Sequence, residues 1–191
     1  KILIYIQSTD NKINPISLET LVAAQQLKQS RGASIHAVTF SKENSEQLKQ
    51  YDIDSIILLE DQNLNSYNPL YFIEALNQLM KSLTPNLIIF GHTYETRDWV
   101  PRLSARFECP FISDCTNIDF TENTTFVRPI YQAKLNERIK LDGKGIISFQ
   151  AGSFSKDDLV KGNCSIDEQA LDLSNLDITI NPGERFKESA E

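Results

Sequence analysis

Short apolar runs alternate with stretches of helical spacing through the first 115 residues of this chain. The runs lie at residues 2–6, 35–40, 55–59 and 86–90, and they are typical of strands buried in a parallel sheet. Apolar positions recur at helical spacing over about 17–30, with Ser17 as the candidate cap and Gly32 as the stop, and over 69–84, ended by Pro85. We expect residues 8–15 to form a loop and about 43–50 a short polar helix.

Residues 90–115 add a fourth helix and a strand near 111–112. Strand and helix therefore alternate four times, which predicts an α/β fold with a Rossmann-like, doubly wound, mostly parallel sheet and right-handed crossovers.

The rhythm changes after residue 115. Residues 116–121, 124–131, 136–142 and 145–150 alternate with short turns, and Asp142-Gly143-Lys144-Gly145 is a turn signal. We expect these four runs to be added antiparallel strands. The chain becomes polar from Ser155, with one short pairing expected within 171–180 and a linker over the last ten residues. The predicted organisation is an α/β domain over 1–154 and a polar terminal segment over 155–191.

The charge balance excludes some classes of partner. The 191 residues carry a net charge of −7, which disfavours nucleic acid, because phosphate binding needs clustered Lys and Arg. No apolar run approaches the roughly 18 residues of a membrane span, so direct membrane insertion is not expected. Three cysteines without a CxxC pair, at 109, 115 and 164, favour idle thiols over a zinc site or a disulfide framework.

Ligands of parallel sheets usually lie beyond the carboxyl ends of the strands, where this chain has loops 7–16, 41–43, 60–68 and 91–97. Phosphate-binding loops need glycines so that backbone N–H groups can approach the anion. The chain has seven glycines, no GxGxxG, and none in the loop QSTDNKIN after the first strand. A self-sufficient nucleotide site there is not expected.

Few side chains suggest chemistry. His92 follows the fourth strand but lacks an evident partner acid, and Thr96 and Asp98 have the positions of helix caps. Arg97 and Arg102 are either solvated or contact another chain. Trp99 is expected to pack against the sheet. Arg128, among apolar neighbours, needs either an ion-pair partner or a bound anion at a domain junction.

The run Gly91…Thr96-Arg97-Asp98…Pro101-Arg102-Leu103-Ser104-Ala105-Arg106 resembles the G-x-T-x-x-G-R-D-x-A-P-R-L-A-A-R run of the electron-transfer flavoprotein alpha subunit. Asp114-Cys115 resembles the end of its T-D-C motif, and Val127-Arg128-Pro129-Ile130-Tyr131 with Lys134 resembles its R-P-x-Y-x-G-K segment. The first helix is also similar, and the resemblance covers about residues 1–155.

The resemblance implies a Rossmann-like N-terminal scaffold domain that packs against a beta subunit in a heterodimer. A C-terminal domain, which would begin where this chain ends, holds the FAD. The complete protein carries electrons from acyl-CoA and other dehydrogenases to a membrane quinone reductase, and is no enzyme itself. The implied location is the bacterial cytoplasm or, less readily, the mitochondrial matrix. Arg97, Asp98 and Arg102 become candidate interface residues, and Arg128 a candidate flavin contact at the subunit junction.

Two departures from the family pattern stand out. Thr96 replaces the glycine before Arg-Asp, and Gln132-Ala133 replaces the glycine pair after the tyrosine. The glycine-rich flavin segment would lie past residue 191, so no FAD binding is expected of this chain alone. Two other classes remain open: a nucleotide-binding regulator of the universal-stress type, which predicts AMP or ATP binding, and an enzyme that uses His92, Asp98 or Asp114.

Overall fold

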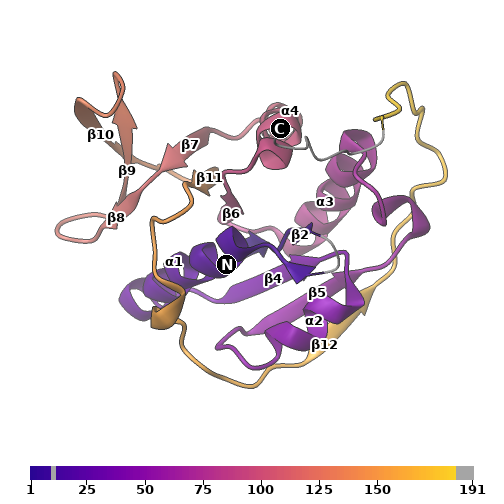
Figure 1. The fold of residues 1–191 in the computed structure, drawn as a ribbon, viewed down its shortest axis with the longest axis horizontal. Coiled ribbons are helices and arrows are strands. Elements are labelled where there is room, and N and C mark those ends of the chain that lie inside the picture. Colours follow the sequence, from indigo (N-terminus) through magenta and orange to yellow (C-terminus); the bar gives the residue numbers. More distant parts are fainter. Residues whose placement is uncertain (10–11, 184–191) are drawn as a thin grey trace, which may run out of the picture.

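A computed structural model describes residues 1–9 and 12–183 of the chain. Within them, a seven-stranded sheet has the order β12-β5-β4-β1-β6-β11-β7, and every pairing in it is parallel (Figure 1). Its strands are β1 (Ile2–Tyr5), β4 (Ile35–Thr39), β5 (Ser55–Leu59), β6 (Leu87–Gly91), β7 (Phe111–Cys115), β11 (Gly145–Phe149) and β12 (Ile166–Gln169). The predicted α/β class and the mostly parallel sheet are confirmed.

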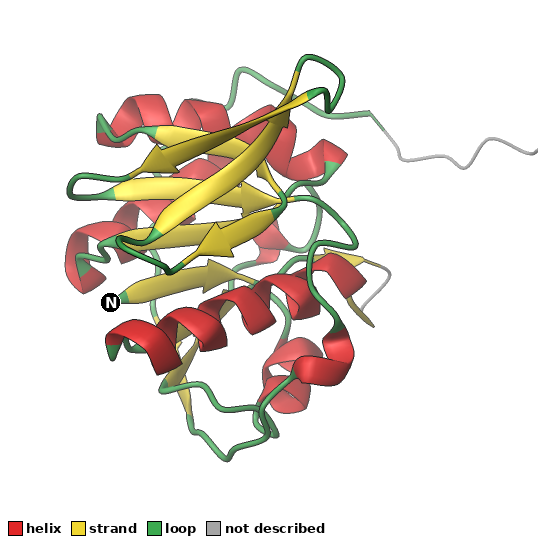
Figure 2. Cartoon of the chain, turned by 90° about the vertical axis from the view of Figure 1, so that its left-hand side faces the viewer, coloured by secondary structure: helices red, strands yellow, loops and turns green. Residues whose placement is uncertain are grey.

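In the described part of the chain, four α-helices connect these strands: α1 (Pro15–Arg31), α2 (Lys42–Leu48), α3 (Pro69–Leu83) and α4 (Tyr94–Phe107). Alternating residues of β1, together with Ile6, which directly follows it, explain why helices cover both faces of the sheet. Ile2, Ile4 and Ile6 belong to one buried cluster with residues of α1, while Leu3 and Tyr5 belong to a second with α3 and α4. The sheet is therefore a middle layer between helices (Figure 2).

The first helix begins earlier than its sequence predicts. Asn14, and not Ser17, is the N-cap, and its side chain accepts a hydrogen bond from the Ile16 N–H. Pro15 occupies the first helical position, where its missing N–H costs nothing. Ser17 is buried and accepts a hydrogen bond from the Gln7 N–H. The expected loop contains two short strands, β2 (Ser8–Thr9) and β3 (Lys12–Ile13), that pair antiparallel. Gly32 ends the helix at φ +64°, as predicted.

Three of the four runs after residue 115 form the expected antiparallel strands, β8 (Asn117–Asp119), β9 (Thr125–Ile130) and β10 (Leu135–Lys140). Their small sheet extends to one side beyond β7 (Figure 1). The expectation for 145–150 was wrong, because β11 lies parallel between β6 and β7. Its five residues are all buried, as in an interior strand.

The C-terminal segment, residues 155–183, packs along the body of the molecule. A short 3-10 helix, η2 (Lys156–Asp158), precedes β12, which pairs with β5 at the sheet edge, and Leu173 is 5% exposed. No strand forms within 171–180, so the short pairing expected there was wrong. The strand pairing of this segment is made by residues 166–169. Of the predicted linker over the last ten residues, 184–191 lie outside the described residues.

Candidate functional site

A large cavity in the described part of the chain lies where β1, β4 and β5 end. Its volume is about 1260 Å³, and each of the four loops predicted from the sequence contributes to its wall: Ser8 from the first, Ser41 from the second, residues 60–68 from the third and Glu95 from the fourth. The location follows from the topology, because parallel strands bring the starts of their crossovers to one edge of the sheet.

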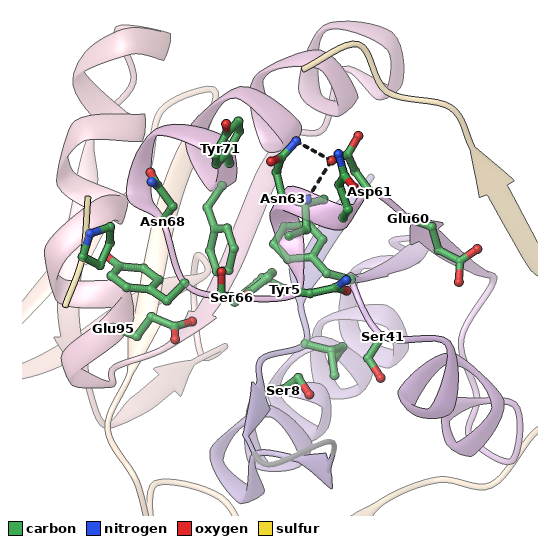
Figure 3. A pocket seen from close by; sticks show the side chains of 18 of the residues that line it. Tyr5, Ser8, Ser41, Glu60, Asp61, Asn63, Ser66, Asn68, Tyr71 and Glu95 are labelled. Carbon is green, nitrogen blue, oxygen red and sulfur yellow. Dashed lines mark hydrogen bonds between the residues drawn. The ribbon is translucent and has the colours of Figure 1, made fainter. Parts of the chain in front are cut away.

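Aromatic rings form much of the cavity wall. Tyr5, Phe40 and Phe72 form a packed series, with ring centroids 5.5 Å apart for the first pair and 4.8 Å for the second. Tyr67 continues it at 5.4 Å from Phe72, and Tyr71 also lines the cavity. Figure 3 shows Tyr5 and Tyr71 with the polar side chains around them. Sequence reasoning identified the 60–68 loop but not these rings, since their grouping depends on the tertiary fold.

The polar wall is held by local capping contacts. Asp61 precedes the 3-10 helix η1 (Gln62–Leu64) and accepts hydrogen bonds from the backbone N–H and the side-chain amide of Asn63, both at 2.8 Å (Figure 3). Asn68 caps α3 and donates its amide to the Ile180 carbonyl at 3.0 Å. Ser41 caps α2 through the Asn44 N–H. These contacts fix the loops that surround the cavity.

The described residues that line the cavity carry a negative net charge. Among its described lining residues, Glu43, Glu60, Asp61 and Glu95 are acidic, and Lys42 is the one basic residue. Four carboxylates against one ammonium group leave a net charge of −3. This described part of the wall disfavours the phosphates of a nucleotide.

Two of the predicted interface residues pair with each other. Arg102 donates to Asp98 at 2.9 Å on the exposed face of α4, and the Tyr67 hydroxyl also donates to Asp98. Burial is the largest cause, and Asp98 the next, of a raised pKa for the Tyr67 hydroxyl. Asp98 is therefore no helix cap. The cap of α4 is Thr93, with Thr96 completing a capping box.

Arg97, the third predicted interface residue, lies beside an aromatic ring. Its guanidinium lies 5.6 Å from the ring centroid of Tyr94, which is 90% exposed. Both residues line a second cavity of about 380 Å³, together with His92. Trp99, two positions further along α4, is fully buried as predicted, with its ring 5.3 Å from those of Tyr5 and Phe90.

His92 has the partners that sequence reasoning did not find. Its Nδ1 lies 2.9 Å from the Ser148 hydroxyl, and its Nε2 lies 3.4 Å from a carboxylate oxygen of Asp114. Burial and the nearby Arg97 lower the pKa of His92, whereas Asp114 raises it. Ser148 is only 1% exposed and also accepts a hydrogen bond from the Asp114 N–H. A hydroxyl that is this buried is not placed to act as a nucleophile. The three side chains instead link the residue after β6 to β7 and β11.

Arg128 lies on β9, away from both cavities. Its Nε is 3.3 Å from a carboxylate oxygen of Glu137 on β10, which confirms the ion pair expected of an arginine in this setting. That Nε is buried without a well-aligned hydrogen bond among the described residues. The Nε–H of the Arg128 guanidinium is therefore a donor without a hydrogen-bond partner among the described residues.

Metal chemistry finds no support among the described residues, where no three His, Cys, Asp or Glu side chains converge. The three cysteines are free thiols, and burial raises the pKa of Cys115 to about 12. The search of the described residues for a helix long and apolar enough to cross a membrane found none.

The sequence of this chain matches one protein family and several curated proteins. A sequence model of a family described as "Electron transfer flavoprotein domain" matches residues 2–173. The "Electron transfer flavoprotein subunit alpha" of Thermoanaerobacterium thermosaccharolyticum is 28% identical over 148 residues, 75% of this chain and 45% of that protein. The protein of the same name from Bacillus subtilis is 27% identical, over 73% of this chain and 43% of that protein.

A third relative carries a different name. "Lactate dehydrogenase (NAD(+),ferredoxin) subunit LctC" of Acetobacterium woodii is 24% identical, over 72% of this chain and 34% of that protein. The chain thus spans less than half the length of each of these relatives that it matches.

Proposed function

The chain belongs to the electron transfer flavoprotein family, and from that membership we propose that it is the scaffold domain of an alpha subunit. In this proposal it docks onto a beta subunit in a heterodimer, and the complete protein carries electrons on FAD from acyl-CoA or other dehydrogenases to a quinone reductase. It is a carrier component and not an enzyme. The bacterial sources of the matching relatives favour the cytoplasm as its compartment.

The family match over residues 2–173 carries the proposal, and the names of the first two relatives, both alpha subunits, support it. A protein named as a subunit has a partner. The relative named as a subunit of lactate dehydrogenase supports association with a dehydrogenase in at least one member of the family.

The described residues do not fit FAD. Its pyrophosphate requires backbone N–H groups in a glycine-rich turn or basic side chains. Of the seven glycines, only Gly91 is at the carboxyl end of a sheet strand, and there it leaves room for Ile16, whose Cγ2 would be 2.5 Å from an added Cβ. The described residues that line the main cavity are net acidic. In our proposal FAD is therefore held by a part of the complete protein outside these residues. The same features disfavour the nucleotide-binding regulator.

Three residues of α4 form the proposed contact with the beta subunit: Arg97, Asp98 and Arg102. Arginine and exposed aromatic residues are enriched at the centres of interfaces, and Arg97 lies beside the 90% exposed ring of Tyr94. The Asp98–Arg102 pair would present a fixed charge pattern beside it. Arg128, which has the position of the arginine in the R-P segment, is the proposed flavin contact at the subunit junction.

Assembly with the beta subunit encoded in the same genome tests the proposal. We expect the Arg97→Ala, Arg102→Ala double variant to weaken binding at least tenfold in titration calorimetry, because arginine anchors often cost about 2 kcal/mol when truncated. Its free energy of unfolding should change by less than about 0.5 kcal/mol, as at other open surfaces. Arg31→Ala, at the far end of α1, is the matched control and should bind normally.

Two outcomes would contradict the proposal. Wild-type chain that shows no binding to the beta subunit would remove the scaffold role, and equal affinity of the double variant would remove the α4 interface. The isolated chain should also be colourless after purification with added FAD. Visible absorption of bound oxidised flavin by this chain alone would show that the cofactor site lies within it.

A further inference from the structure

We propose that Asp142 is a site of spontaneous modification, where the side chain closes onto the backbone nitrogen of Gly143 and the aspartate converts to isoaspartate. Both residues lie in the turn that joins β10 of the small sheet to β11 of the central sheet (Figure 1). Three observations meet there: an Asp-Gly pair, an exposed carboxylate and a backbone N–H without a hydrogen bond among the described residues. The proposal does not depend on assembly with a beta subunit.

The conversion takes two balanced steps. In the first, the Gly143 nitrogen attacks Cγ of the protonated Asp142 side chain. A C–N bond forms, a C–O bond breaks, the N–H proton leaves with the oxygen as water, and a five-membered succinimide ring results. In the second, water adds to one of the two ring carbonyls and breaks its bond to nitrogen. Opening at the backbone carbonyl leaves isoaspartate, in which the main chain runs through Cγ, whereas opening at Cγ restores aspartate. One water is released and one consumed, so no other reactant is needed.

The sequence directs this reaction to one position. Gly143 is the only one of the seven glycines that follows an aspartate, and none of them follows an asparagine. A side chain on the residue after the aspartate crowds the attacking nitrogen, and glycine has none. Gly143 also has a φ of +95°, in the region that glycine adopts readily. The turn geometry therefore favours the residue that leaves this nitrogen least hindered.

The fold leaves the pair accessible. The Asp142 side chain is 87% exposed, and Gly143 and Lys144 are exposed as well. The Gly143 N–H donates no hydrogen bond within the described part of the chain, so its nitrogen can attack without breaking one. Asp142 does lie 3.3 Å from the Lys140 Nζ, but both groups are exposed, and such pairs hold their partners only weakly.

Asp54 shows how the fold opposes the same reaction elsewhere. It precedes Ser55, another small residue, at the start of β5. Its carboxylate accepts a hydrogen bond from the Ile35 N–H at 2.8 Å and lies 3.1 Å from the Lys28 Nζ. A carboxylate held by these contacts must break them to reach the next backbone nitrogen, so we expect far less isomerisation at Asp54 than at Asp142.

The product would alter the connection to β11, because isoaspartate lengthens the backbone of the turn by one carbon atom. The turn has little room for it at its end: a Cβ added at Gly145 would lie 2.6 Å from a Leu141 methyl carbon. The Gly145 N–H also donates to the Asn86 carbonyl at 3.0 Å, where the buried strand begins. The added atom must shift Leu141 or loosen the start of β11, so the modified chain is expected to be less stable.

Incubation of the purified chain at neutral pH over several weeks, followed by peptide mapping with mass spectrometry, tests the site. We expect an isomer of unchanged mass at Asp142, in at least tenfold greater amount than at Asp54. The matched variant is Asp142→Glu, which keeps the charge but would have to form a six-membered ring, and it should yield no such product. Absence of the isomer at Asp142, or equal amounts at the two aspartates, would overturn the proposal.

Two further measurements test the part played by the fold. The isomerisation rate at Asp142 in the folded chain should be within tenfold of the rate in the chain unfolded by guanidinium chloride, because the turn is accessible. A larger difference would show that the turn is protected and would overturn the proposal. The isoaspartate form, separated by chromatography, should melt at least about 2 °C below the unmodified chain from the same sample. Equal melting temperatures would overturn the inferred effect on β11.

Discussion

Three consecutive residues at the tip of the β9–β10 hairpin, Tyr131, Gln132 and Ala133, have φ values of 51°, 57° and 60°. Left-handed backbone costs residues with a Cβ roughly 1–2 kcal/mol each, whereas glycine adopts it freely. This geometry gives a physical reason for the glycines found after the tyrosine in the motif that this chain resembles. Here Gln132-Ala133 occupies their place, and the turn persists in a strained form.

Replacing Gln132 by glycine should therefore stabilise the protein. Relief of strain exceeds the greater unfolded-state entropy of glycine, and we expect a gain of about 0.5–1 kcal/mol. The measurement is the midpoint of urea unfolding, with an unchanged slope. Lys134→Gly, outside the left-handed run, is the control and should bring no gain. A lower midpoint for Gln132→Gly than for wild type would show that the turn is held without strain.

At the scale of elements, the C-terminal segment joins parts that are far apart in the sequence. The Gln25 side chain on α1 donates to the Val160 carbonyl at 3.0 Å and accepts from the Val160 N–H at 2.9 Å. Two residues later, Gly162 donates its N–H to the Gln50 carbonyl at 3.0 Å. These contacts align the chain for β12, whose pairing with β5 closes one edge of the sheet.

Gly162 is the point of closest approach in this junction. A Cβ added there would lie 2.7 Å from the Asp52 Cα and 2.8 Å from its backbone nitrogen, and backbone cannot move aside as a flexible side chain can. We expect Gly162→Ala to cost about 1–3 kcal/mol of unfolding free energy. Hydrogen exchange should show reduced protection in β12 before the other strands.

Gly183→Ala is the matched control for that substitution, because an added Cβ there meets nothing within 4 Å. Its unfolding free energy and its exchange pattern should equal those of wild type. If Gly162→Ala behaved like this control, the segment would not be docked at Asp52 in solution.

The sequence predicted the elements that have a strong local hydrophobic pattern. It did not predict strands whose place in the sheet depends on tertiary pairing. The runs at β1, β4, β5 and β6 are apolar, as interior parallel strands require. β11 is equally apolar, but its position after two hairpin strands suggested an antiparallel partner, and nothing local specifies insertion between β6 and β7. β12, with the sequence IDEQ, has no strand pattern and is held by backbone pairing to β5.

The candidate site divides in the same way. Its place at the strand ends follows from the parallel topology, so the four loops could be named from the sequence. The sequence could not show which rings line the cavity, because they come from separate elements. Tyr5 lies on β1, Phe40 follows β4 and Phe72 lies on α3. The partners of His92 were hidden for a similar reason: Asp114 and Ser148 lie 22 and 56 positions away and meet it only across adjacent strands.

At the scale of the whole molecule, the C-terminal segment bears on where the folded unit ends. The sequence predicts a boundary between residues 154 and 155, and that boundary stays a prediction. The family match extends to residue 173, which is a leucine only 5% exposed in the cluster beneath α3 and α4. Beyond it, the Asn68 amide still binds the Ile180 carbonyl. We infer that residues 155–183 contribute to the stability of the α/β unit.

A chain that ends at Phe154 tests this inference. It loses the pairing of β12, the Gln25–Val160 hydrogen bonds and the buried Leu173 side chain, and loss of a buried leucine side chain alone costs about 2–5 kcal/mol. We expect the free energy of unfolding to fall by at least about 3 kcal/mol. At roughly 2–4 °C per kcal/mol for this size, the melting temperature should drop by about 6–12 °C or more. Leu173→Ala in the intact chain should reproduce part of that drop. A shortened chain that melts within about 2 °C of the intact one would instead support the 154/155 boundary, with the remainder acting as a linker.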